Sequence, residues 1–136
     1  MKVKVSRKGH FNAAHRLHNP NWSDEKNREV FGNCNNVNYH GHNYVIYAHV
    51  IGPIDEESGY VIDLGELKEI MNEEVLTRYD HKNLNLDCED FKHLNPTAEN
   101  IVVTIWQRMR KRLKPSLDLT ITLYETERNF VEYSGE

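Results

Sequence analysis

The sequence predicts an α+β fold, in which a four-stranded, largely antiparallel sheet carries two helices on one face. Three observations lead to this prediction. Two strand-like segments open the chain, two amphipathic helical patterns follow them, and two more strand-like segments close it, which gives the order ββααββ. Because 136 residues is close to the commonest size of one domain, we expect residues 1–136 to form a single domain.

The first two strands are predicted from alternation and from residue type. Residues 3–11 place Val3 and Val5 two apart and end in an aromatic residue, which is typical of a strand. Residues 42–51, HNYVIYAHVI, are rich in β-branched and aromatic side chains and are closed by Gly-Pro. Between these strands, residues 19–38 contain seven asparagines, which predicts a long functional loop. We expect the two strands to pair antiparallel.

The two helices and the last two strands follow from periodicity. Apolar residues at helical spacing predict a first helix over residues 64–79, with Asp63 as its cap. A second helix of about 17 residues is predicted to begin at Pro96, capped by Asn95 or Thr97. Strict alternation over residues 117–124 and a short apolar segment at 130–133 predict the third and fourth strands.

Composition narrows the possible classes of function. The chain has 17 Lys and Arg against 21 Asp and Glu, a formal net charge of -4, which argues against nucleic-acid binding. No apolar run approaches the roughly 20 residues that cross a bilayer, so we expect no membrane span. The first residues lack the apolar core of a signal peptide, and we therefore expect a cytoplasmic protein whose two cysteines are thiols.

Histidine is unusually frequent, with eight copies. His40 and His42 flank Gly41, and alternate residues of an extended segment project from one face, where they can hold a single ion. His15, just after the first strand, is the best placed third ligand if the two strands pair. Three neutral imidazoles without a fourth protein ligand describe a catalytic zinc site with an open position. The alternative is that His-Gly-His forms an ordinary polar face of a strand.

Two further positions could carry acid-base chemistry. Cys34 lies in the asparagine-rich segment, where a nearby cation could ionise its thiol, although a small buried space-filling residue is an equal alternative. Cys88 stands among three carboxylates that oppose ionisation, so we interpret it as an inert thiol. Asp80 and His81 are adjacent, as in a proton relay in which a carboxylate orients an imidazole. A solvated helix end explains the same pair.

Carboxylates near the end of the chain are candidates for ligand binding. Glu125 ends the alternating strand, and a carboxylate at the rim of a sheet can accept two parallel hydrogen bonds from an amidine-like edge, although a surface glutamate is equally consistent. Glu99 stands at a predicted helix start, where capping and the helix dipole are its first explanation.

Five segments taken together resemble the 6-pyruvoyl tetrahydropterin synthase family. The most specific segment combines the thiol with both histidines and their spacing, and the resemblance extends over nearly the whole chain. They are FNAAHRL (11–17), CNNVNYHGHNY (34–44), VIDLGELK (61–68), YDHKNLN (79–85) and PTAEN (96–100).

The resemblance implies a fold and a set of site residues. The fold is the tunnelling fold (T-fold), in which ββααββ units trimerise so that their sheets close into a barrel, and two trimers stack into a homohexamer with active sites between subunits. Closure of the sheets would also remove exposed strand edges. The implied roles are zinc ligands for His15, His40 and His42, a catalytic thiol at Cys34 assisted by Asp80 and His81, a pterin anchor at Glu125, and pterin-pocket positions at Thr97 and Glu99.

The implied reaction is that of a carbon-oxygen lyase in tetrahydrobiopterin biosynthesis. It converts 7,8-dihydroneopterin triphosphate to 6-pyruvoyl tetrahydropterin, eliminating triphosphate without an external oxidant. Arg16 and Lys82 are candidates for contacts to the triphosphate. One departure from the family pattern is Tyr39, which stands where the family commonly has glycine before His-Gly-His.

Two other functions compete with this one. The homologous 6-carboxytetrahydropterin synthase of queuosine biosynthesis uses the same zinc, thiol and substrate, but typically places three residues between the cysteine and the first histidine. Here five residues, 35–39, intervene, which favours the pyruvoyl-forming branch. A zinc- or pterin-binding module without turnover is the other alternative, and it would be expected to lack the thiol or the Asp-His pair.

Overall fold

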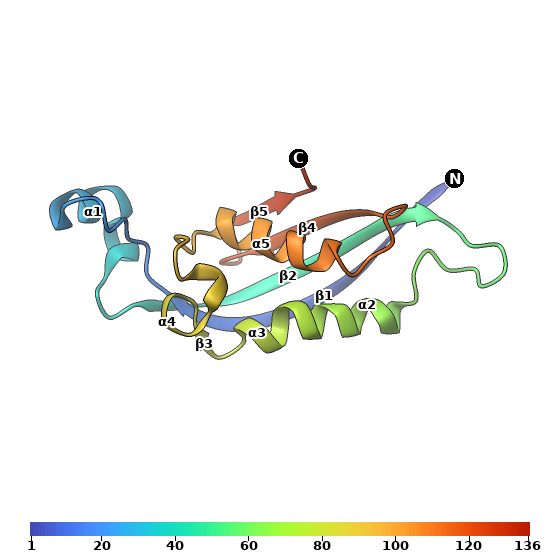
Figure 1. The fold of residues 1–136 in the computed structure, drawn as a ribbon, viewed down its shortest axis with the longest axis horizontal. Helices are drawn as coiled ribbons and strands as arrows, with labels where there is room; N and C mark the ends of the chain where they lie inside the picture. Colours follow the sequence, from blue (N-terminus) through green and yellow to red (C-terminus); the bar gives the residue numbers. More distant parts are fainter.

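The computed structural model describes residues 1–136, and its helices lie against one face of a long, twisted sheet (Figure 1). None of the helices is both long and apolar enough to cross a membrane. The strands are β1 (Lys2–His15), β2 (His40–Pro53), β3 (Lys82–Asn83), β4 (Asp118–Tyr124) and β5 (Phe130–Tyr133), and the helices are α1 (Asp24–Phe31), α2 (Leu64–Met71), α3 (Thr77–Tyr79), α4 (Leu84–Asp87) and α5 (Ala98–Arg110), with a π-helical turn at Asn72–Leu76 and 3-10 turns at Gly32–Asn35 and Glu89–Phe91.

The sheet has five strands in the order β3-β1-β2-β4-β5, so the predicted number of four is wrong. The four predicted strands pair antiparallel, as expected. The fifth, β3, pairs parallel with β1 at Ala13 and Ala14, which makes the sheet mixed. A two-residue strand is too short to leave an alternating pattern in the sequence. Its pairing depends instead on where the chain lies after the end of α3.

The face of the sheet that the helices cover is apolar. The register pairs Phe11 with Tyr44 and Ala48 with Ile121, and facing residues in an antiparallel ladder point to the same side. These residues belong to one cluster of 24 buried hydrophobic residues, which α2 and α5 complete. Both main helices therefore lie on one face, as the sequence predicts.

The two main helices agree with the predictions in position and differ in detail. Asp63 caps α2 by accepting a hydrogen bond from the backbone N–H of Gly65 at 2.8 Å, and helical structure continues to Tyr79 through the π-helical turn. Thr97 caps α5 by accepting from the N–H of Asn100 at 3.1 Å. This helix has 13 residues rather than 17, because residues 111–117 turn back toward β4.

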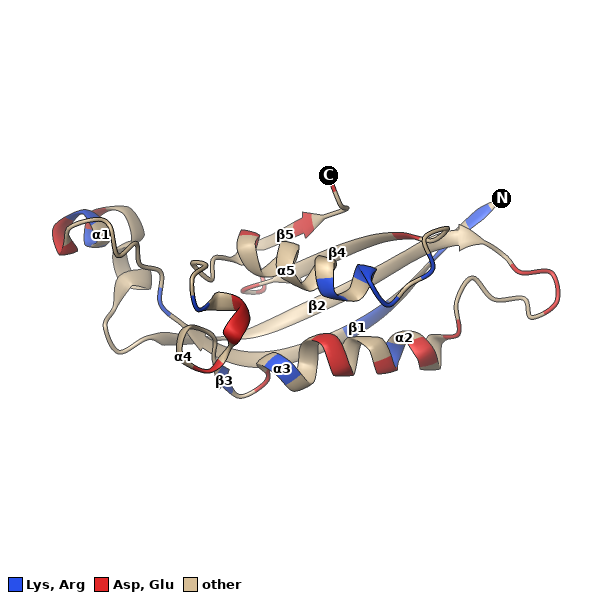
Figure 2. Cartoon of the chain, viewed as in Figure 1, with Lys and Arg blue, Asp and Glu red and all other residues tan.

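Ion pairs join the two main helices near their ends. Acidic positions follow the α2 helix and basic positions gather toward the end of α5 (Figure 2). The Arg108 guanidinium donates to both carboxylate oxygens of Asp90, at 2.5 and 2.9 Å, and lies 3.7 Å from Glu74. A bidentate pair has a defined geometry, so it fixes the segment that precedes α5 against the helix itself.

The predicted loop over residues 19–38 is partly wrong, because α1 and a 3-10 turn lie within it. Ser23 starts α1 by accepting from the N–H of Lys26 at 3.1 Å. The buried Asn27 side chain accepts from the N–H of Asn19 and donates to its carbonyl, at 2.7 and 2.9 Å. The asparagines thus close a compact excursion of the chain at one end of the sheet (Figure 1). The asparagine-rich composition by itself predicts only turns, and it does not predict this helix.

Candidate metal and substrate site

Three histidines converge where β1 ends and β2 begins. The register pairs His15 with His40 and Ala13 with His42, which places the three imidazoles on the helix-covered face. Their candidate ligand nitrogens all lie within 4.8 Å of one another, and the ring centroids are 4.6 to 5.0 Å apart. The structure therefore brings together the three predicted metal ligands.

The tautomer of His15 is set by its hydrogen bond, and its charge by its burial. Its Nδ1 lies 2.7 Å from the carbonyl oxygen of Pro96, and a carbonyl can only accept, so Nδ1 carries the proton and Nε2 presents a lone pair. Burial lowers the pKa of His15 to about 4, and burial together with neighbouring His42 lowers the pKa of His40. Both rings are neutral at pH 7, which is the form that binds a metal.

The ring nitrogens of this group lack partners. Buried polar atoms are nearly always hydrogen-bonded, and each one left unpaired costs about 1–3 kcal/mol. An ion held by all three histidines would satisfy one such nitrogen on each ring, so these residues fit a metal. The buried side-chain nitrogens without a hydrogen-bond partner are His15 Nε2, His40 Nδ1 and Nε2, and His42 Nε2.

Glu125 and Cys34 complete the surroundings of the three histidines. The two carboxylate oxygens of Glu125 lie 3.9 Å from His42 Nε2 and 4.0 Å from His15 Nε2. Burial, and then the nearby Glu125 carboxylate, raise the pKa of the half-buried Cys34 thiol. In the absence of a cation the thiol is therefore protonated, and a cation beside it would favour the thiolate.

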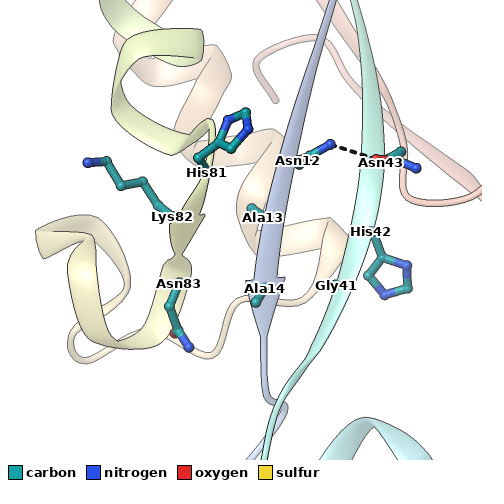
Figure 3. A pocket seen from close by; sticks show the side chains of 9 residues that line it. All are labelled: Asn12, Ala13, Ala14, Gly41, His42, Asn43, His81, Lys82 and Asn83. Atoms are coloured by element: carbon teal, nitrogen blue, oxygen red, sulfur yellow. Dashed lines mark hydrogen bonds between the residues drawn. The ribbon is translucent and has the colours of Figure 1, made fainter.

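Asp80 and His81 form a pair just before β3, which is an edge strand of the sheet. Asp80 lies 3.0 Å from His81 Nδ1, and the N–H of Asn12 donates to Asp80 at 2.9 Å; this bond, followed by His81, lowers the pKa of the carboxyl. The His81 side chain is 80% exposed, and no hydrogen bond or ion pair joins it to Cys34 within the chain. Figure 3 shows the His81 and His42 rings on opposite sides of the β1–β2 pair.

The backbone around His81 is unusual. His81 has a φ of 61°, in the left-handed region, and its N–H donates to the Asn12 carbonyl at 2.7 Å. Such a conformation costs a side-chain-bearing residue about 1–2 kcal/mol. Strained residues that the surroundings hold in place cluster at functional sites, which favours a role for His81 over a loosely solvated helix end.

Thr97 and Glu99 occupy the start of α5. Thr97 is the helix cap described above, and it follows Pro96, whose carbonyl holds His15. Glu99 is exposed in the first turn, where a carboxylate is favoured by the helix dipole. The structure therefore places Thr97 close to the histidine group, whereas the Glu99 side chain makes no hydrogen bond or ion pair within the chain.

Two contributors to this site were not predicted. Pro96 is one, and nothing in its sequence surroundings marks a carbonyl 81 positions away from the histidine that it binds. Tyr44 is the other; its hydroxyl lies 3.4 Å from His15 Nδ1. The spacing of His40, His42 and Tyr44 could have indicated it, because alternate residues of a strand share a face.

Comparisons with known proteins agree with the resemblance drawn from the sequence motifs. Residues 4–136 match the family described as 6-pyruvoyl tetrahydropterin synthase. The chain is 45% identical to 6-pyruvoyl tetrahydrobiopterin synthase of Drosophila melanogaster over 132 residues, which cover 96% of this chain and 79% of that protein. It is 42% identical to the Homo sapiens protein of the same name over 135 residues, which cover 99% of this chain and 93% of that protein.

A solved structure gives the same result. The Caenorhabditis elegans 6-pyruvoyl tetrahydropterin synthase aligns with a TM-score of 0.94 at 39% identity, covering 100% of this chain and 97% of that one. The arrangement of the sheet and its helices is therefore the same as in this relative. Since the family match and the relatives both span nearly the whole chain, the protein belongs to the 6-pyruvoyl tetrahydropterin synthase family.

Proposed function

We propose that this protein is a zinc-dependent 6-pyruvoyl tetrahydropterin synthase of the cytoplasm, which converts 7,8-dihydroneopterin triphosphate to 6-pyruvoyl tetrahydropterin and releases triphosphate. The observation that carries the proposal is the group of three imidazoles whose buried nitrogens lie close to one another without hydrogen-bond partners. Family membership indicates the class of substrate, and the three histidines indicate where the proposed reaction would take place.

The ligand set favours zinc. Three histidine nitrogens without a fourth protein ligand leave a coordination position for substrate, as in catalytic zinc sites, whereas structural zinc sites are closed by four protein ligands. Bound there, zinc would act as a Lewis acid toward the oxygens of the substrate side chain and make the adjacent C–H bonds more acidic. The hydrogen bond from His15 to Pro96 orients the ring for this role, as outer partners of metal-binding histidines commonly do.

Cys34 is the proposed base. Its raised pKa within the isolated chain means that it needs a neighbouring positive charge to act as a thiolate. His81, oriented by Asp80, is the proposed proton shuttle, and a neighbouring subunit would deliver it to Cys34 because the two are not joined within one chain. Protons that Cys34 removes from a carbon of the substrate would return through His81 to the side chain of the substrate as triphosphate leaves.

The strand edges support an assembly of subunits. β1 has 14 residues, but β3 covers only two of them on its outer side, and the outer edge of β5 has no partner strand. Unpaired edges of this length are normally covered. Pairing of β1 with β5 of the next subunit would close a trimeric barrel, and two such trimers would make the expected homohexamer.

The pterin is proposed to lie next to the metal ligands. Glu125, only partly exposed, would accept paired hydrogen bonds from the guanidine-like edge of the pterin. Thr97 and Glu99, at the start of α5, would form another part of the pterin pocket.

The test is direct product identification. Purified protein is incubated with 7,8-dihydroneopterin triphosphate, with and without prior chelation, and the pterin product is identified by mass spectrometry. A zinc-dependent pyruvoyl product supports the proposal. A carboxy product would assign the protein to the 6-carboxytetrahydropterin synthase branch, and no turnover by the zinc-loaded protein would leave a binding module as the function.

A further inference from the structure

A basic cavity lies next to the histidine group, between the excursion that contains α1 and the segment that precedes α5. Its volume is about 620 Å3, and Pro96, which holds His15, forms part of its wall. No Asp or Glu lines it, although the chain has more acidic than basic residues. Its basic side chains are Arg16, His18, Lys92 and His93.

Two of these basic side chains are held in place by one buried amide. Asn35 is 5% exposed; its carbonyl accepts from Arg16 Nε at 3.0 Å, and its side-chain amide donates to His18 Nδ1 at 2.9 Å and to the Leu17 carbonyl at 2.7 Å. Because the amide donates to Nδ1, that nitrogen is the acceptor, so the neutral ring carries its proton on Nε2. Asn35 therefore fixes the orientation of both side chains.

Two more asparagines fix the backbone that carries these side chains. Asn85 accepts from the N–H of Arg16 at 2.8 Å and donates to its carbonyl at 2.9 Å. Asn95 accepts from the N–H of His18 at 3.1 Å. The backbone of residues 16–18 is thus held by side-chain amides from two other segments of the chain, and this rigidity reduces the entropy lost when a ligand binds.

The hydrogen-bonding groups left over are donors. The two terminal nitrogens of Arg16 and the Nε2 of His18 have no hydrogen-bond partner in the chain, and Lys92 makes only a loose, exposed pair with Glu89 at 4.0 Å. A wall that combines the oriented donors of Arg16 and His18 with the Lys92 ammonium, and that contains no carboxylate, is complementary to an anion with several oxygens. A guanidinium with two free N–H groups matches phosphate geometry in particular.

We infer that this cavity binds a polyphosphate chain, with Arg16, His18 and Lys92 contacting its oxygens and Asn35 acting as a positioning residue. The inference rests on the proposed function only for the source of the phosphates, since the proposed substrate carries three of them. Arg16, one of the predicted triphosphate contacts, lines this cavity and also a neighbouring one that contains Asp24. Lys82, the other, lines a different cavity beside His81.

The test is calorimetric titration of the assembled protein with inorganic tripolyphosphate. To exclude binding of the probe to a metal, the titration is repeated in the His42→Ala background. Arg16→Gln is expected to weaken binding about tenfold, the usual loss for a charged hydrogen bond, and Lys92→Gln about threefold. Lys68→Gln, which removes the same charge from the exposed side of α2, is the matched control and should leave the affinity unchanged.

Equal affinities for the wild type, Arg16→Gln and Lys92→Gln would overturn the inference, as would binding that disappears in the His42→Ala background. Lys92 is exposed and makes no structural contact beyond Glu89, so its variant tests the site without endangering the fold. Because binding is measured without turnover, the result stands apart from the test of the proposed function.

The source of the phosphates is distinguished by inhibition kinetics. Tripolyphosphate that competes with 7,8-dihydroneopterin triphosphate, with a KM raised by Lys92→Gln at unchanged kcat, identifies the substrate tail as the occupant. Tripolyphosphate that binds with the same dependence on Arg16 and Lys92 but does not compete identifies a separate phosphorylated ligand.

Discussion

Histidines lie on both faces of the sheet, and the two groups differ in how their nitrogens are satisfied. On the helix-covered face, the histidines at the strand ends leave four buried nitrogens without partners. On the opposite face, His49 in the middle of β2 uses both nitrogens: Nδ1 lies 2.7 Å from Ser6 Oγ, and Nε2 lies 3.1 Å from Thr122 Oγ1. Thr122 in turn donates to a carboxylate oxygen of Glu132 at 2.8 Å.

The direction of every bond in the His49 chain follows from its last member. Glu132 as a carboxylate only accepts, so Thr122 donates to it and its oxygen accepts from His49 Nε2, which leaves Nδ1 to accept from Ser6. This polar chain crosses four strands and is complete. Unpaired buried nitrogens, rather than the number of histidines, therefore indicate where an external ligand is needed.

The largest expected difference between the two groups is in metal content. His42→Ala removes one of three ligands, and the protein should lose nearly all of its bound zinc. His49→Ala removes a histidine from the same strand and should retain a full complement. The measurement is elemental analysis of both purified variants after dialysis. Full zinc occupancy in His42→Ala would remove that residue from the ligand set.

The next largest effect separates metal binding from proton transfer. Cys34→Ala should keep its zinc but lose triphosphate elimination by about a hundredfold or more, because a positioned base contributes about 10²–10⁴-fold. Steady-state rates with 7,8-dihydroneopterin triphosphate, together with metal analysis of the same sample, check this. A variant that turns over at the wild-type rate would show that the thiol is not the base.

Whether two subunits share the site can be tested by complementation. Cys34→Ala and His81→Ala are each expected to be inactive, but coexpressed subunits assembled at random should recover about a quarter of wild-type activity, because that fraction of interfaces joins an intact thiol to an intact imidazole. Equal coexpression of wild-type and Cys34→Ala subunits provides the calibration. No recovery in the mixed protein would place both residues of each site in one chain.

The pH dependence of stability should reveal the paired histidine. Burial, and then Lys4, lower the pKa of His49, while Glu132 raises it. With a folded pKa below the unfolded value of about 6.5, the unfolded state binds more protons in the interval between them, so the free energy of unfolding falls as pH drops below about 6.5. His49→Gln, measured by urea denaturation from pH 7 to 5 on metal-free protein, should show a shallower fall. An unchanged slope would contradict this assignment.

Local patterns in the sequence predict most of the fold, and the predictions end where pairing is non-local. Alternation and strand-forming residue types located four strands, and helical spacing located both main helices, since each signal lies within its own element. The strand at Lys82–Asn83 and the carbonyl of Pro96 depend on chain segments brought together from far apart. Spacing alone found His40 and His42, whereas the part played by His15 needed the pairing of β1 with β2.

The smallest expected effect concerns the backbone immediately before His40, which positions one of the three histidines that have unpaired nitrogens. Tyr39, which stands where the family commonly has glycine, has a φ of 67° immediately before His40, in the left-handed region that favours glycine. Tyr39→Gly and Tyr39→Ala remove the same aromatic ring, but only glycine also removes the clash of a β-carbon. We expect the glycine variant to be more stable than the alanine variant by about 1 kcal/mol in urea denaturation.

The matched control is Val30, exposed in the α1 helix, where the order should reverse because glycine costs about 1 kcal/mol relative to alanine in a helix. If alanine were the better residue at both positions, the backbone before His40 would not be strained. If the order reverses as expected, the strained backbone that places His40 beside His15 and His42 lowers the stability of the chain. His49 lies within a regular strand and needs no such distortion.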